Sequence, residues 1–69
     1  MKIGTVKFFN ATRGFGFIEP ADGEGEVFIH ISALERAGLT SLVEGQKLRY
    51  EVVQDPVSGR IAAENVQAL

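Results

Sequence analysis

Short runs of β-branched and aromatic residues, separated by glycine-containing turns, occupy most of this sequence, and no segment sustains the 3.6-residue period of an amphipathic helix. Such runs, bounded by Gly, Pro, Asn, Asp or Ser, are typical of β-strands. We therefore expect five strands, over residues 2–10, 14–19, 26–31, 46–54 and 60–66. The fourth run alternates most regularly, with Leu48, Tyr50 and Val52 on one side and charged residues on the other.

One segment departs from this pattern and indicates a short helix. Ser32 is followed three residues later by Glu35, which is the capping-box pattern, and Gly38 suits a left-handed helix end. We expect one or two helical turns over residues 32–38, within a long connection between the third and fourth strands. The element order predicts an all-β fold, a small five-stranded barrel that residues 1–69 form as a single domain.

The composition narrows the classes of function. Cysteine is absent, which excludes disulfides and thiolate metal sites and fits a reducing compartment. No apolar run resembles a signal peptide or a membrane span, so we expect a cytoplasmic protein with no membrane partner. One histidine and three serines leave little material for catalysis. We therefore expect a protein that is not an enzyme and that has no metal, no cofactor and no small-molecule substrate.

The third strand carries large apolar groups on both faces, although a small barrel has only one interior. Phe28 and His30 share one face, and the aliphatic residues Val27, Ile29 and Ile31 share the other. An aliphatic set suits a dry core, whereas a set that contains histidine is costly to bury. We therefore expect Phe28 and His30 to face solvent.

The second strand repeats this arrangement. Phe15 and Phe17 point to one side together with Arg13, and Gly14 and Gly16 fall on the opposite, inward side, where a missing side chain lets a strand curve tightly. The two strands together predict an exposed aromatic surface of Phe15, Phe17 and Phe28. An exposed aromatic cluster usually marks a binding surface.

Flat rings beside cationic groups suit unpaired nucleic-acid bases, because each base has a π-face that stacks on a ring. Lys7 and Arg13 can contact phosphates, and His30 can stack or form a hydrogen bond. The net charge of −2 does not oppose this reading, because many acidic residues lie in the second half of the chain. Phe9 is expected in the core or at its rim, whereas the position of Phe8 stays open, because strict alternation places it with Val6 and opposite Lys7.

Two other classes of function are compatible with a small barrel or with a lone histidine. A small barrel can also grip a proline-rich or extended peptide, although such sites usually use Tyr and Trp rather than Phe. A hydrolase would need a general base and usually a metal, and no carboxylate cluster accompanies His30 in the sequence. Peptide binding therefore remains the alternative function.

Four motifs in register give the sequence a specific resemblance. They are Gly4-Thr5-Val6-Lys7-Phe8-Phe9-Asn10, Arg13-Gly14-Phe15-Gly16-Phe17-Ile18, Val27-Phe28-Ile29-His30-Ile31-Ser32 and Leu42-Val43-Glu44-Gly45-Gln46. At this spacing they resemble the bacterial cold-shock protein family over almost the whole chain.

The resemblance implies a five-stranded antiparallel barrel of the OB type that binds single-stranded RNA or DNA. It implies an RNA chaperone that works without ATP, with a role in the cold-shock response or in gene regulation, and we expect a monomer. Carried over by position, the ligand-binding residues are Lys7, Phe8, Arg13, Phe15, Phe17, Phe28 and His30, and further contributors are Asn10, Ile31, Leu39 and Arg60.

Three positions depart from the family's pattern. The family usually has tryptophan at Phe8, commonly phenylalanine at Ile31 and often another phenylalanine near Leu39. These differences reduce the stacking area at the edges of the aromatic surface and leave its centre intact. We expect the same class of ligand, bound more weakly or through fewer bases.

Overall fold

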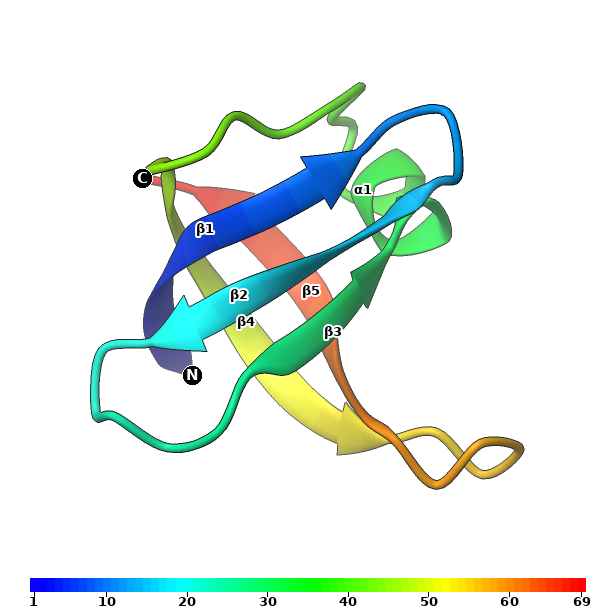
Figure 1. Ribbon diagram of the computed structural model, residues 1–69. Coiled ribbons are helices and arrows are strands. Elements are labelled where there is room, and N and C mark those ends of the chain that lie inside the picture. Colours follow the sequence, from blue (N-terminus) through cyan, green and yellow to red (C-terminus); the bar gives the residue numbers. More distant parts are fainter.

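The computed structural model describes residues 1–69, which form five strands and one short helix (Figure 1). In chain order, the elements are β1 (Lys2–Asn10), β2 (Phe15–Pro20), β3 (Val27–His30), α1 (Ile31–Arg36), β4 (Lys47–Gln54) and β5 (Ile61–Ala68). The predicted all-β class, the number of strands and the short helix between the third and fourth strands are confirmed.

The strands close into a barrel in the order β1-β2-β3-β5-β4. Four neighbouring pairs are antiparallel, but β3 and β5 run parallel, paired at Phe28 and Ala62. The expected barrel is therefore confirmed with one parallel contact. The reason is geometrical: five is an odd number, so strand directions cannot alternate all the way around a closed ring.

The helix is where local sequence reasoning was wrong. It spans Ile31–Arg36 rather than residues 32–38, and its N-cap is His30, whose side chain accepts the backbone N–H of Ser32. Ile31 is therefore the first helical residue and not the end of β3. The interpretation of Gly38 as the end of the helix is confirmed, because Gly38 has φ +77° and its N–H donates to the carbonyl of Glu35.

The barrel interior is filled by aliphatic side chains and one tyrosine. The largest fully buried residues are Val6, Ile18, Ile29, Leu34, Leu48 and Tyr50, and none of the five phenylalanines is among the buried core residues. The predicted inward side of β4 is confirmed by Leu48 and Tyr50, and Val52 packs against the same core. Burial raises the pKa of the Tyr50 hydroxyl above its usual value.

The inward glycines allow two strands to approach each other closely. A Cβ added at Gly16 would lie 2.3 Å from the carbonyl oxygen of Phe8. This distance is too short for any side chain to be accommodated at Gly16. Gly16 is paired with Phe9 on β1, so the glycine lies where the backbones of β1 and β2 are close together. Gly16 is buried, so its predicted inward position is confirmed, and the close approach of the two strands is a further reason for a glycine there.

Candidate nucleic-acid interface

The outer face of β2 and β3 presents four rings in two cross-strand pairs. Phe15 lies opposite His30, and Phe17 lies opposite Phe28. Their neighbours Gly16, Ile18, Val27 and Ile29 are buried, whereas the three phenylalanines are half-buried and His30 is exposed. The predicted division of these strands into an aliphatic inner face and an aromatic outer face is confirmed.

The rings form a continuous array rather than isolated groups. The Phe15 and Phe28 rings are stacked, with centroids 6.0 Å apart and planes 19° apart. Phe17 meets both edge-on, with centroids 6.1 Å from Phe15 and 5.9 Å from Phe28. The imidazole of His30 lies 6.3 Å from the Phe28 ring. We call Phe8, Phe15, Phe17, Phe28 and His30 the ring surface.

Phe8 joins the ring surface because β1 contains a bulge. Val6 is paired with Ile18 and Phe8 with Phe17, so Lys7 is the extra residue that has no partner on β2. The bulge resets the alternation, and both Lys7 and Phe8 are exposed. The Phe8 ring consequently lies 6.0 Å from that of Phe15. This decides the position that strict alternation left open.

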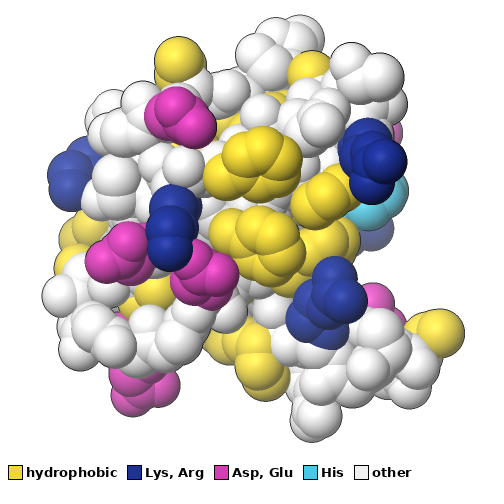
Figure 2. Space-filling view, viewed as in Figure 1, with side chains coloured by type: hydrophobic (Ala, Val, Ile, Leu, Met, Phe, Trp, Pro, Cys, Tyr) yellow, Lys and Arg dark blue, Asp and Glu magenta, His cyan; other side chains and the backbone are white.

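Hydrophobic side chains gather at the centre of this face, over β2 and β3, with Lys and Arg side chains around them and acidic side chains to one side (Figure 2). The nearest cation to a ring is Arg60, whose Cζ lies 4.9 Å from the Phe28 centroid. Arg13 lies exposed in the turn between β1 and β2 and forms no ion pair with the protein. Neither of these two guanidinium groups forms an ion pair within the protein.

Lys7 differs from the two arginines because an acidic partner already holds it. Its ammonium group donates a 2.5 Å hydrogen bond to Glu26, in the connection between β2 and β3. This bond holds the pKa of Lys7 above its usual value. A phosphate that binds Lys7 must therefore compete with the Glu26 carboxylate. No periodicity signalled this contact, because it joins residues 19 positions apart.

The remaining predicted residues have structural contacts of their own. Asn10 accepts the backbone N–H of Arg13 and so shapes the β1–β2 turn. Ile31 is half-buried, and its backbone N–H donates to the carbonyl of Gly14. Leu39 is half-buried and packs against the core. Phe9 also packs against the core, in agreement with the expectation that Phe9 lies in the core or at its rim. Of these further contributors, Arg60 lies over a ring of the ring surface, and Asn10 is the cross-strand partner of Phe15.

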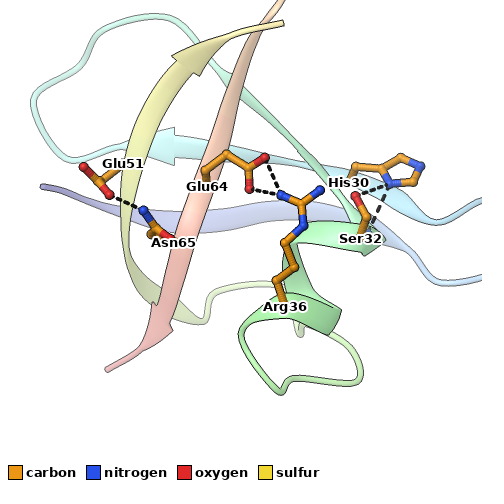
Figure 3. A network of polar contacts seen from close by, with 6 residues as sticks. All are labelled: His30, Ser32, Arg36, Glu51, Glu64 and Asn65. Carbon is orange, nitrogen blue, oxygen red and sulfur yellow. Dashed lines mark hydrogen bonds and ion pairs between the residues drawn. The ribbon is translucent and has the colours of Figure 1, made fainter.

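A groove borders the ring surface on the side of β5. Its volume is about 560 Å³, and it is lined by Phe28, His30 and Arg60, by the β4–β5 turn and by α1. Across it, Arg36 of α1 donates two hydrogen bonds of 2.8 Å to the carboxylate of Glu64 on β5 (Figure 3). The ring surface is therefore continuous with a concave polar region.

The chain has neither a metal-binding cluster nor a membrane-spanning helix. No three His, Cys, Asp or Glu side chains lie close enough together to hold a metal ion. The chain also contains no helix with the length and apolar character needed to cross a bilayer.

Comparison with known proteins agrees with this geometry. The model of the 'Cold-shock' DNA-binding domain matches residues 2–69. The chain is 62% identical over 68 residues to a probable cold shock protein, y4cH, of Sinorhizobium fredii, and 59% identical over 68 residues to cold shock protein CspA of Rhizobium meliloti, with 99% of each chain covered in both cases. It is 52% identical over 66 residues to cold shock-like protein CspC of Shigella flexneri, covering 96% of this chain and 93% of the relative. A five-stranded barrel, an outward aromatic array and these matches together establish that the chain belongs to the cold-shock domain family, whose members bind nucleic acids.

Proposed function

We propose that this protein binds single-stranded RNA or DNA by stacking unpaired bases on the ring surface. The observation that carries the proposal is the contact array itself: five rings lie within about 6 Å of their neighbours on one face of the barrel. A duplex hides the faces of its bases, so this surface favours unpaired strands. Stacking on an aromatic side chain contributes roughly 1–3 kcal/mol per base.

The cations around the rings give the interaction a charge component. Arg13 and Arg60 form no ion pair within the protein, and Lys7 becomes available when phosphate displaces Glu26. Two or three phosphate contacts on a single strand predict that log affinity falls with log salt at a slope of roughly −1.5 to −2. The overall charge of −2 does not oppose this, since the contacts are local.

We further propose that the protein acts as an RNA chaperone without ATP, in the cold-shock response or in gene regulation. Binding to unpaired segments shifts an RNA folding equilibrium towards open forms by mass action, because only the open form offers base faces. No nucleotide hydrolysis is needed for such a shift. The supporting facts are the ring surface and the cold shock proteins to which the chain is similar.

The binding experiment uses short fluorescently labelled homopolymers of RNA and DNA, single-stranded and duplex, at two salt concentrations. A label is required because the protein has no tryptophan. Tight binding to single strands, weak binding to duplexes and a negative salt slope are expected. A labelled proline-rich peptide is included as a competing ligand class. Binding to the peptide in place of the oligonucleotides would refute the proposal.

The chaperone experiment uses an RNA hairpin with a fluorophore and a quencher at its ends. Adding the protein without ATP should increase the open fraction, and the effect should saturate with protein concentration. The matched control is Val43→Ala, which changes an exposed aliphatic side chain in the loop before β4 and leaves the rings intact. Strand binding without hairpin opening would leave the binding proposal standing and refute the chaperone proposal.

A further inference from the structure

His30 has two contacts that constrain its imidazole. It is the last residue of β3 and the N-cap of α1, with an extended backbone at φ −102° and ψ 151°. The backbone N–H of Ser32 donates to its Nδ1 over 3.1 Å, and the Ser32 Oγ lies 3.0 Å from the same nitrogen. Figure 3 shows the Nδ1 side of the ring turned towards Ser32.

These contacts determine which ring nitrogen carries the proton. A backbone N–H can only donate, so Nδ1 must accept, and a neutral imidazole that accepts at Nδ1 has its hydrogen on Nε2. Nδ1 has one lone pair, so the Ser32 hydroxyl, whose Oγ lies 3.0 Å away, can only share it as a second donor. The cap of α1 therefore selects the Nε2–H tautomer of His30.

The second nitrogen belongs to the ring surface. The His30 side chain is exposed, its ring lies 6.3 Å from that of Phe28 at an angle of 35°, and it faces Phe15 across the strand pair. No hydrogen-bond partner within the protein uses Nε2. A strand that stacks on Phe15 or Phe28 thus meets one N–H donor of defined position beside the rings.

We propose that His30 is a ligand-contacting residue, whose Nε2–H donates a hydrogen bond to an acceptor oxygen of the bound strand. The inference rests on the proposed function, which supplies the single-stranded ligand, and on the cap of α1, which supplies the Nε2–H tautomer. The oxygen belongs either to a base carbonyl, a group that adenine lacks, or to a phosphodiester. The cap has a second consequence: the donor is fixed before the ligand arrives.

The first test concerns the free protein and needs no ligand. Because the chain has one histidine, its ring nitrogens give a single set of NMR signals. At a pH where the imidazole is neutral, two-bond nitrogen–proton spectra should show a protonated Nε2 and an unprotonated Nδ1. Ser32→Ala removes the hydroxyl but keeps the backbone N–H, so it should preserve this pattern. A protonated Nδ1, or an even mixture of tautomers, would overturn the assignment.

The second test separates donation from capping and stacking. Nε2-methylhistidine at position 30 keeps the ring and the Nδ1 acceptor and loses only the donor, so thermal stability should not change. Losing one hydrogen bond should weaken binding about two- to tenfold. His30→Asn provides a comparison, because Asn is among the best N-cap residues but offers neither the ring nor Nε2–H. It should unfold near the wild-type temperature and bind more weakly, whereas a purely structural role predicts unchanged binding.

Three probes identify the acceptor: oligothymidine, oligoadenine and oligothymidine with methylphosphonate linkages. If a base carbonyl is the acceptor, methylation of His30 Nε2 weakens binding of both thymidine probes and leaves binding of oligoadenine unchanged. If a phosphate accepts, methylation weakens binding of both natural strands, and it weakens binding of the methylphosphonate strand less, because the remaining phosphoryl oxygen is uncharged and a weaker acceptor. Equal affinities with and without the methyl group would overturn the inference, and so would an equal loss on all three probes, which indicates a steric effect. Failure of the unmethylated protein to bind any probe would instead refute the proposed function.

Discussion

The guanidinium of Arg60 lies over the ring of Phe28, with Cζ 4.9 Å from the ring centroid. Arg60 belongs to the β4–β5 turn and Phe28 to β3, so the contact crosses the parallel seam of the barrel. In the free protein the cation therefore covers part of the ring to which a base would stack. A bound strand can use the displaced guanidinium as a phosphate contact.

Replacing Arg60 tests this relationship. Arg60→Ala should weaken strand binding and reduce the magnitude of the salt slope by about 0.7, because one phosphate contact is lost. It should also lower the free energy of unfolding by about 0.5–1 kcal/mol, the size of an exposed cation–π contact. Arg60→Lys should retain most of the salt slope. Arg49→Ala removes an exposed cation from β4 and serves as the control. An unchanged slope in Arg60→Ala would exclude Arg60 from the interface.

Removing single rings separates binding from folding. Phe15→Ala, Phe17→Ala and Phe28→Ala should each weaken binding by about 1–3 kcal/mol, measured by titration of a labelled single strand. Because these rings are half-buried on the outer face, the loss of unfolding free energy should stay below the roughly 3–5 kcal/mol typical of a core phenylalanine. Urea denaturation checks the second value. Variants that fail to fold would assign these rings to the core.

Enlarging the ring at the bulge should strengthen binding. Phe8 is 38% exposed, so an indole can extend over solvent without disturbing the core. We expect Phe8→Trp to improve the binding free energy by about 0.5–1 kcal/mol, a fraction of the value of one stacked base. Phe8→Leu, which keeps an apolar side chain but no ring, should weaken binding. The new tryptophan also allows the titration to be followed by intrinsic fluorescence. Identical affinities for all three proteins would show that Phe8 does not contact the ligand.

The close approach of β1 to β2 makes Gly16 intolerant of a side chain. The methyl group of Gly16→Ala would clash with the Phe8 carbonyl oxygen. The free energy of unfolding should therefore fall by about 1–3 kcal/mol. Gly25→Ala is the matched control, because no atom lies within 4 Å of its added Cβ and its φ is not positive. Equal stability of the two variants in urea would contradict the strand geometry described above.

The β4–β5 turn should contribute a pH-dependent part of the stability. The backbone N–H groups of Val57 and Ser58 hold the pKa of Asp55 below its usual value. A lowered folded-state pKa means that the stabilisation is complete above about pH 4 and is lost as the pH falls through the folded-state pKa. Asp55→Asn should therefore be less stable than wild type at neutral pH, and the difference should shrink in acid. Urea denaturation of both proteins at neutral and acidic pH checks this, and a stability difference that does not change with pH would contradict the role of Asp55.

Much of the ring surface could be predicted from local pattern. In β2 and β3, alternation alone separates the aliphatic inner face from Phe15, Phe17 and Phe28, because successive side chains of a regular strand point to opposite faces. The same rule could not place Phe8. A bulge is a property of two paired strands, and the extra residue at Lys7 becomes visible only in the register of β1 against β2.

The helix cap illustrates a competition that sequence inspection does not resolve. Ser32 and Glu35 satisfy the capping-box pattern, but β3 ends at His30 and the helix begins at the next residue, Ile31. His30 therefore occupies the N-cap position. The start of the helix depends on where strand pairing stops, with Phe15 and His30 as the last pair. The dual position of His30, as a cap and as a member of the ring surface, follows from this tertiary arrangement.

By itself the sequence determined the all-β class, the inner and outer faces of the regular strands and the family, because alternation and motif spacing are local properties of the chain. Only the tertiary structure decided the outward turn of Phe8, the pairing of Lys7 with Glu26 and the position of Arg60 over Phe28. Each of these depends on strand register or on a contact between residues distant in sequence. Such contacts form when the barrel closes, and no periodicity along the chain encodes them.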